Sequence, residues 1–238
     1  MPLGVSRINN NISKRVAKTI TNGGGATLSS TQAKFGPTSL AVSISASTSS
    51  HFVTITPLAD LAFTGDFTYE CWIYPVNLSG TGSNVHYMID NRASTGDTNA
   101  IGINVDASGR VTVSGLGQTA FVSSSSAVVT VNNWQHVAVT RSGTTVTLWV
   151  GGTSRATGTS SAAISQVSRS HTIGRGATST TQTFRGYIDE VRYSNIARYT
   201  AAFTPDTTRF QNDGNTVFLS HFDGVTAATT FVEDNGAG

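Results

Sequence analysis

The sequence predicts a single all-β domain in which two antiparallel sheets pack face to face. Three observations support this: segments in which apolar and polar residues alternate, short glycine-containing turns between them, and almost no stretch with a helical period. The composition agrees, because 38% of the 238 residues are hydrophobic, which is enough for a core, and only 12% are charged. A disordered chain typically combines low hydrophobicity with high net charge.

The clearest strand covers residues 67–74. Phe67, Tyr69 and Cys71 alternate with residues that point to the other face, and Pro75 ends the strand. Apolar residues occur on both faces, so we expect the second face to be at least partly covered. Cys71 is expected to be a small buried hydrophobe within this pattern.

Two hairpins are expected further along the chain. Residues 101–105 and 110–114 flank a short turn in which Gly109 can supply the positive φ that such loops require. Residues 134–140 and 144–150 form the second hairpin. Later strands are expected at 171–174, 184–193 and 216–222, and a helix only at 194–199.

The chain divides into three segments. Residues 1–24 are polar and Asn-rich and are expected to form an extended arm, which is ordered only if it lies on a sheet or on a neighbouring subunit. Residues 25–215 hold the sandwich. Residues 216–238 are expected to complete the sheet or to dock on a neighbouring subunit or repeat, because an unpaired terminal strand would expose a row of backbone donors and acceptors.

Charge and hydrophobicity argue against two classes of partner. The formal net charge is +2 with Lys and Arg scattered along the chain, so no nucleic-acid surface is predicted. No run of about 18 apolar residues and no signal-peptide core is present, so neither membrane insertion nor export is predicted. The single cysteine excludes an internal disulfide, as expected for folding in a reducing cytoplasm.

Three segments together resemble the laminin-G-like, concanavalin A-like lectin-glucanase family: residues 67–75, 134–141 and 186–192. Their order and spacing also match, and the resemblance spans roughly residues 32–205. It implies an antiparallel jelly-roll sandwich that serves adhesion, carbohydrate binding or assembly, and less often hydrolysis.

Versions of this domain in bacteriophage virion proteins are the most similar, because residues 197–200 (ARYT) and 203–205 (FTP) resemble their endings. The resemblance implies a non-enzymatic virion structural protein, as a capsid decoration or a tail-fibre component, that is made in the host cytoplasm. Its partners would be other virion proteins and further copies of itself. The alternative is a lectin-like module that recognises host-surface glycans. Residues 219–224 resemble an opening strand displaced to the C-terminus, which indicates a rearrangement.

Hydrolysis is the third and least favoured class, and no catalytic residue is predicted. A glycosidase needs two carboxyl groups facing each other about 5–9.5 Å apart. Asp189 and Glu190 are adjacent in a strand, so their side chains should point to opposite faces unless a bulge intervenes. Glu70 and Glu190 are expected to pair with Arg or backbone groups. The acidic strand motif of related glycosidases is absent, as is a Gly-x-Ser-x-Gly elbow, and the five His lack the spacing of a zinc site.

Trp149 is the predicted ligand-binding residue. It alternates with Val146, Leu148 and Val150 in a way that turns it away from the core, where its ring could pack against a pyranose. The competing interpretation is that a loop or neighbouring chain covers the ring. The other two tryptophans, Trp72 and Trp134, are expected in the core, and His136 is expected to be structural.

No cofactor is predicted except a possible calcium ion, which the family resemblance implies because relatives often bind it through loop oxygens. Asp90, Asn91 and Asp97 lie in a suitable loop. Calcium takes six to eight oxygens, and Asp and Asn are equally natural as turn formers, so both interpretations stay open.

Overall fold

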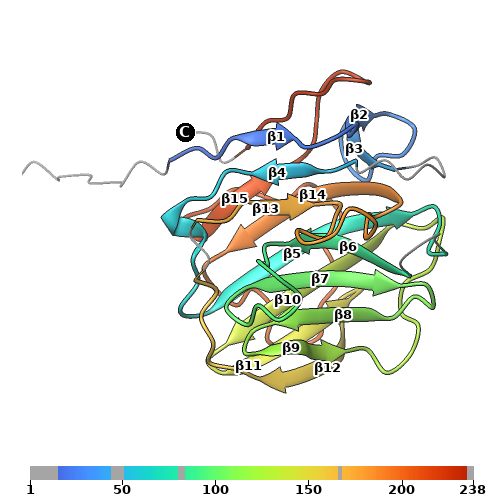
Figure 1. Cartoon of the computed structure of the whole chain (residues 1–238). Helices are drawn as coiled ribbons and strands as arrows, with labels where there is room; N and C mark the ends of the chain where they lie inside the picture. The colour runs from blue at the N-terminus through green and yellow to red at the C-terminus, as the bar shows by residue number, and fades with distance from the viewer. Residues whose placement is uncertain (1–15, 44–50, 80–83, 166–167, 235–238) are drawn as a thin grey trace, which may run out of the picture.

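The fold is a two-layered all-β sandwich, as the sequence predicts (Figure 1). The computed structural model describes residues 16–43, 51–79, 84–165 and 168–234. Within these ranges the one helical element is the 3₁₀ turn η1 (Ala59–Leu61). The predicted arm lies outside the described residues up to position 15. Over the described ranges, no helix is long and apolar enough to span a membrane.

Sheet A has seven strands, drawn largely in front in Figure 1. Its spatial order is β1 (Ile20–Asn22), β4 (Val53–Ile55), β13 (His171–Ile173), β6 (Val85–Asp90), β7 (Ile101–Asp106), β8 (Val111–Gly115) and β9 (Gln118–Ser123). All pairings between neighbours are antiparallel.

Sheet B has eight strands and packs against sheet A. Seven of them follow the order β12 (Thr153–Thr159), β11 (Thr145–Val150), β10 (Gln135–Ser142), β5 (Phe67–Pro75), β14 (Gly186–Ser194), β3 (Ser39–Val42) and β2 (Thr27–Ser29). The eighth, β15 (Thr216–Ser220), pairs with β14 beyond the end of β3. Alternate residues of each strand face the space between the sheets, where Phe67, Tyr69, Val139, Leu148 and Ile188 belong to one buried cluster.

The two predicted hairpins are present as β7–β8 and β10–β11. Gly109 and Gly143 adopt φ values of 82° and 60° in their turns, which other residues adopt only with strain.

The helix predicted at residues 194–199 is wrong. β14 continues through Ser194, and the backbone that follows bonds to β5 instead of to itself. The Thr68 hydroxyl donates to the carbonyl of Ile196 and accepts from the amide of Arg198, at 2.7 and 2.9 Å. These tertiary bonds outweigh a weak local preference for helix.

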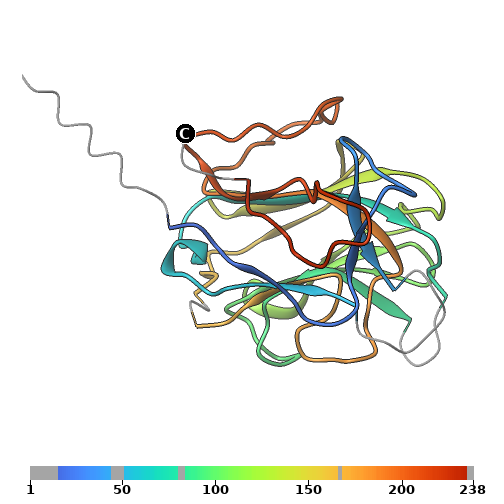
Figure 2. The same ribbon diagram turned by 90° about the horizontal axis from the view of Figure 1, so that it is seen from above.

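The described parts of both terminal segments pair within the chain. β1 pairs with β4, and β15 pairs with β14. The segment after β15 crosses the edge of the sandwich between the two sheets, as Figure 2 shows from above. There the amide of Leu28 in β2 donates to the carbonyl of Ala228, the carbonyl of Leu28 accepts from the amide of Ala227, and the amide of Asp234 donates to the carbonyl of Leu219 in β15. Because Phe231 also forms a backbone bridge with Ile20 of β1, residues 227–234 contact both sheets along this edge.

The strand β14 contains a bulge at the position of the two adjacent acids. Asp189 pairs with Trp72 and Arg192 with Glu70, so β14 has one extra residue there. Glu190 adopts a φ of 53°, and both acids turn toward the outer face of sheet B. The exception stated for this pair therefore applies: a bulge breaks the alternation, and both acids lie on the same face.

Candidate functional site

The segment 195–213, here named the strap, covers part of the outer face of sheet B, over β5, β10, β11 and β14. Its Tyr199 hydroxyl donates to Glu70 at 2.7 Å, and its Phe210 amide donates to Glu190 at 2.8 Å. Phe203 stacks on Tyr199, with ring centroids 3.6 Å apart, and packs edge-on against Trp149 at 5.7 Å. The strap is thus attached to sheet B by a hydrogen bond at Tyr199, a hydrogen bond at Phe210 and, between them, the packing of Phe203 on Trp149.

Glu70 is the centre of a buried polar network beneath the strap. Its carboxylate accepts from His136 Nε2 at 3.1 Å, from Arg192 Nε at 2.7 Å and from the Tyr199 hydroxyl. Burial alone would raise the pKa of Glu70, but the hydrogen bonds and the Arg192 charge outweigh it and lower the pKa to about 2. The sequence expectations that Glu70 pairs with Arg and that His136 is structural agree with these contacts.

The two acids of the bulge are also engaged. Asp189 accepts from the backbone amides of Lys34, Phe35 and Glu190 at 2.8, 3.3 and 2.9 Å, while burial raises its pKa to about 8. Glu190 bonds to His221 Nδ1 at 2.8 Å in addition to the strap. Like Glu70, both acids are 0% exposed. Each carboxyl group therefore has its own fixed partners.

Trp149 lies on the outer face of sheet B, as its alternation predicts, but its ring is only 3% exposed. The indole Nε1 donates to the Thr140 hydroxyl at 2.8 Å, and Phe203 of the strap covers the ring. This is the covered arrangement that the sequence left open. Ligand binding by Trp149 stays a prediction, and it requires the strap to move aside.

Beyond the strap, three aromatic side chains form a row across neighbouring strands, here named the aromatic row: Trp134, Tyr74 and Tyr187. Tyr74 pairs directly with Tyr187 across β5 and β14, and Trp134 immediately precedes β10. The Tyr74 ring centroid lies 5.5 Å from that of Trp134 and 6.0 Å from that of Tyr187. Tyr187 is buried, but Trp134 and Tyr74 are only half-buried, so both of these residues are partly accessible to solvent.

Polar groups flank this row. Asn132 and Asn133 are exposed and directly precede Trp134. The backbone N–H of Asn132 donates to the carbonyl of Pro75 at 2.7 Å, which anchors the turn. On the neighbouring side, Lys34 Nζ lies 4.0 Å from the ring centroid of Trp72. Aromatic faces bordered by amide and ammonium groups are the chemistry that sugar binding needs.

The row was not predicted from the sequence, because Trp134 was expected in the core together with Trp72. Trp72 is buried, but in a separate outer cluster with Phe210 and Leu219, and Trp134 packs against the edge of that cluster. The signal that could have found the row is the shared outward face of the three residues, which becomes visible only once the strand register is known.

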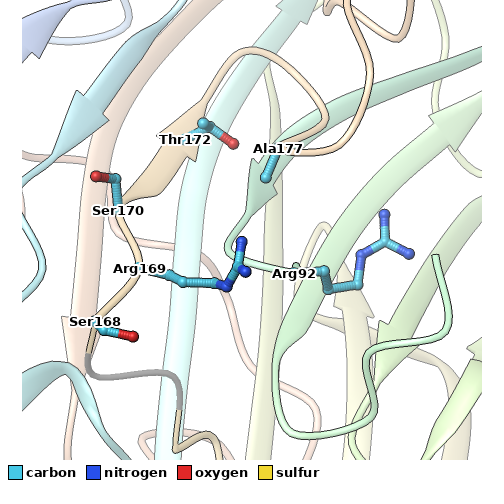
Figure 3. Close-up of a pocket in the computed structure, with 6 residues that line it drawn as sticks. All are labelled: Arg92, Ser168, Arg169, Ser170, Thr172 and Ala177. Atoms are coloured by element: carbon cyan, nitrogen blue, oxygen red, sulfur yellow. The ribbon is translucent and has the colours of Figure 1, made fainter. Parts of the chain in front are cut away.

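Figure 3 shows a pocket at the rim of sheet A. The predicted calcium residue Asp90 lies beside it, because it bonds to two of the residues that line the pocket, Arg92 and Ala177. The pocket has a volume of about 420 Å³ and is lined by Arg92, Ser168, Arg169, Ser170, Thr172 and Ala177. Asp90 binds Arg92 with both carboxylate oxygens, at 2.8 and 3.0 Å, and also accepts from the Ala177 amide at 2.9 Å. A guanidinium group therefore occupies the position where a cation would be expected.

The other two predicted calcium residues hold the loop together. The Asn91 side chain accepts from the Ile101 amide at 2.8 Å and lies 3.1 Å from His171 Nε2, and Asp97 accepts from the amides of Ala93 and Asn99. Among the described residues, no group of three or more His, Cys, Asp or Glu is placed to hold a metal. The arrangement fits the turn-forming interpretation better than an ion site, and calcium binding stays a prediction.

Comparison with known proteins decides the family. The laminin-G model of the concanavalin A-like lectin/glucanases superfamily matches residues 47–202, which is more than half of the chain. The chain belongs to this family. This confirms the family resemblance and the jelly-roll class predicted from residues 67–75, 134–141 and 186–192. A search of curated proteins found no match.

Solved structures share the fold at low sequence identity. A putative carbohydrate binding protein from Bacteroides ovatus is 15% identical with a TM-score of 0.55, over 93% of this chain and 56% of its own. Tailspike protein 2 of an Escherichia coli O157:H7 bacteriophage is 14% identical with a TM-score of 0.60, over 87% of this chain and 30% of its own. The binding domain of Paraclostridial Mosquitocidal Protein 1 is 14% identical with a TM-score of 0.55, over 76% and 45%. The chain thus spans about half or less of the length of these three proteins, and at such identities the likeness is one of fold.

Proposed function

We propose that this jelly-roll domain is a non-enzymatic glycan-binding module whose contact surface is the aromatic row. The observation that carries the proposal is the pair of half-buried aromatic residues Trp134 and Tyr74, whose ring centroids lie 5.5 Å apart. Tyr74 is on β5 and Trp134 immediately precedes the neighbouring strand β10, so the sheet positions both residues and little conformational entropy is lost when a pyranose packs its C–H face against them. The exposed amides of Asn132 and Asn133 can then bond to the sugar hydroxyls.

The burial and the fixed hydrogen bonds of the three carboxyl groups support a binding role over a hydrolytic one. Hydrolysis of a glycoside needs two carboxyl groups that reach the same bond from an open groove. Glu70, Asp189 and Glu190 are 0% exposed, and each is bound to backbone amides or to cationic and hydroxyl side chains. Catalysis by these groups would require breaking those contacts.

The proposed setting is a bacteriophage particle, as a capsid decoration or a tail-fibre component that contacts host-surface glycans. The sequence features at residues 197–200 and 203–205 support this, and a tailspike protein shares the fold. Another similar structure is described as a putative carbohydrate binding protein. In this setting the protein is made in the host cytoplasm and assembles with further copies of itself and with other virion proteins.

A glycan array tests the proposed contact surface. We expect wild-type protein to bind a defined set of glycans, and Trp134→Ala and Tyr74→Ala each to weaken that binding about 30-fold, because central aromatic contacts are worth about 2 kcal/mol or more. Trp149→Phe serves as the matched control, since Trp149 is already covered by the strap. Thermal unfolding of each variant shows whether it is folded.

Two results would overturn the proposal. One is a folded wild-type protein that binds no glycan on a broad array. The other is a glycan whose affinity falls equally in Trp149→Phe and in Trp134→Ala, because that would move the contact surface away from the aromatic row.

The assembly setting predicts self-association. We expect light scattering to give a mass that is a multiple of the 24.8 kDa chain, since closed homo-oligomers are the commonest assemblies of soluble proteins. A single-chain mass at all concentrations up to about 100 µM, an order-of-magnitude limit for stable oligomers, would count against it.

A further inference from the structure

We propose that the pocket beside Asp90 is a second binding site, for a ligand that carries a carboxylate, such as the terminal uronic or sialic acid of a glycan. Figure 3 shows Arg169 extending across this pocket toward the chain at Arg92, with Thr172 and Ala177 on one side. The proposal does not depend on the aromatic row, because the two sites are far apart in the fold.

The strand directions separate the sites. The aromatic row lies where β5 ends, at Tyr74, and His86 at the start of β6 bonds to Leu78 just beyond it. β6 then runs the length of sheet A to Asp90, beside the pocket. The pocket is therefore at the opposite end of the sandwich from the aromatic row.

The charge balance of the pocket is positive. Two arginines line it, and Asp90 neutralises only one of them, because its two oxygens are bound to Arg92. Arg169 is exposed, and no carboxylate of the described residues forms an ion pair with it. One guanidinium group therefore remains to attract an anion.

The floor of the pocket is rigid. The Arg92 guanidinium stacks on the Tyr87 ring, with its carbon 4.8 Å from the ring centroid. The Arg92 guanidinium also lies against Gly102 of β7. A larger residue at this position would clash with it, because a Cβ there would lie 2.6 Å from Arg92 Nε. The Thr172 hydroxyl bonds to the Asp90 carbonyl at 2.8 Å and closes the floor on the other side. The floor that faces Arg169 is thus held in place by its own contacts.

The donors present suit a carboxylate on a ligand the size of a sugar. Arg169 offers a planar fork of N–H donors that matches the two oxygens of a carboxylate, and Ser168 and Ser170 on either side of it add hydroxyl groups. A volume of about 420 Å³ lies in the range of small-ligand pockets and can hold one sugar ring.

Calorimetric titration with three matched trisaccharides tests the site: trigalacturonate, neutral galactotriose and a sulfated galactotriose. Wild-type protein is expected to bind trigalacturonate at least tenfold more tightly than galactotriose. Arg169→Ala should remove this preference, and Arg169→Lys should restore only part of it, because an ammonium group lacks the fork. Arg155→Ala is the matched control, since Arg155 is exposed on β12 and its loss changes the net charge equally.

The outcomes separate the sources of any effect. Equal weakening by Arg169→Ala and Arg155→Ala would show general attraction to a basic protein and overturn the proposal. Tighter binding of the sulfated sugar than of trigalacturonate would overturn the carboxylate assignment. Trp134→Ala should leave trigalacturonate binding unchanged, so failure of this site and failure of the aromatic row are distinguishable.

Discussion

Replacing Glu70 with alanine is expected to lower the free energy of unfolding by about 3–5 kcal/mol, the cost of removing one partner from a buried ion pair. The substitution leaves Arg192 and His136 in a buried site without their carboxylate, and it removes the acceptor that ties Tyr199 of the strap to the sheet. Urea unfolding measures the loss, with Glu70→Gln as a second variant that keeps the size of the side chain.

Asp213→Ala is the matched control for Glu70→Ala. Asp213 also pairs with an arginine of the strap, Arg198, at 2.8 Å, but its side chain is 43% exposed. Exposed pairs are worth about 0–1 kcal/mol, so the control should be much closer to wild type. If Glu70→Ala cost no more than Asp213→Ala, the buried network would not be what holds the strap.

The low pKa of Glu70 gives the same network a pH dependence. Its folded-state pKa of about 2 lies below the ordinary value of 4.5. Its contribution is therefore fully present above about pH 4.5 and is lost as the pH falls toward 2, because the unfolded chain takes up the proton first. The difference in stability between wild type and Glu70→Gln should shrink over this interval.

The second large effect is destabilisation in mild acid through His171. Its ring lies in the core, parallel to Tyr69 at 6.1 Å and against Tyr193 at 5.4 Å, and Asn91 bonds to its Nε2. Burial lowers its pKa from 6.5 to about 3. Between pH 6.5 and 3, the unfolded chain therefore binds a proton at His171 and the folded chain does not. The free energy of unfolding falls as the pH decreases over this interval.

The expected loss from His171 is about 2 kcal/mol at pH 5, because each pH unit below 6.5 costs about 1.4 kcal/mol. Asp189 acts in the opposite direction: its raised pKa of about 8 makes stability increase as the pH falls from 8 toward 4. The measurement is therefore the difference in unfolding free energy between wild type and His171→Gln from pH 7 to pH 4.5. His51→Gln, at a half-buried position, is the control. A pH-independent difference would show that His171 takes up its proton equally in the folded and unfolded states, which contradicts the lowered pKa.

Much of the fold could be predicted because it depends on local patterns. The alternation at Phe67, Tyr69 and Cys71 predicts which residues enter the core, and the turn at Gly109 predicts a hairpin. The same alternation places Trp149 on the outer face. It cannot show that Phe203, more than fifty residues away, lies over the ring, because that contact depends on tertiary packing.

The candidate sites could not be predicted because each depends on a register or a long-range contact. The outward turn of both Asp189 and Glu190 follows from one bulge residue, which no local signal indicates. The aromatic row appears only when β5, β10 and β14 are aligned. At the predicted calcium loop, the sequence showed Asp90 but not that Arg92, two residues later, folds back on it.

Tryptophan fluorescence during titration with a glycan that the array identifies tests the central claim most directly. Of the three tryptophans, Trp72 and Trp149 are 7% and 3% exposed, and only Trp134 is half-buried. If the aromatic row is the contact surface, the glycan should produce a saturable change in emission and protect the protein from acrylamide quenching. Both effects should disappear in Trp134→Phe and persist in Trp149→Phe. A change that persists in Trp134→Phe and disappears in Trp149→Phe would contradict the account and place the glycan beneath the strap.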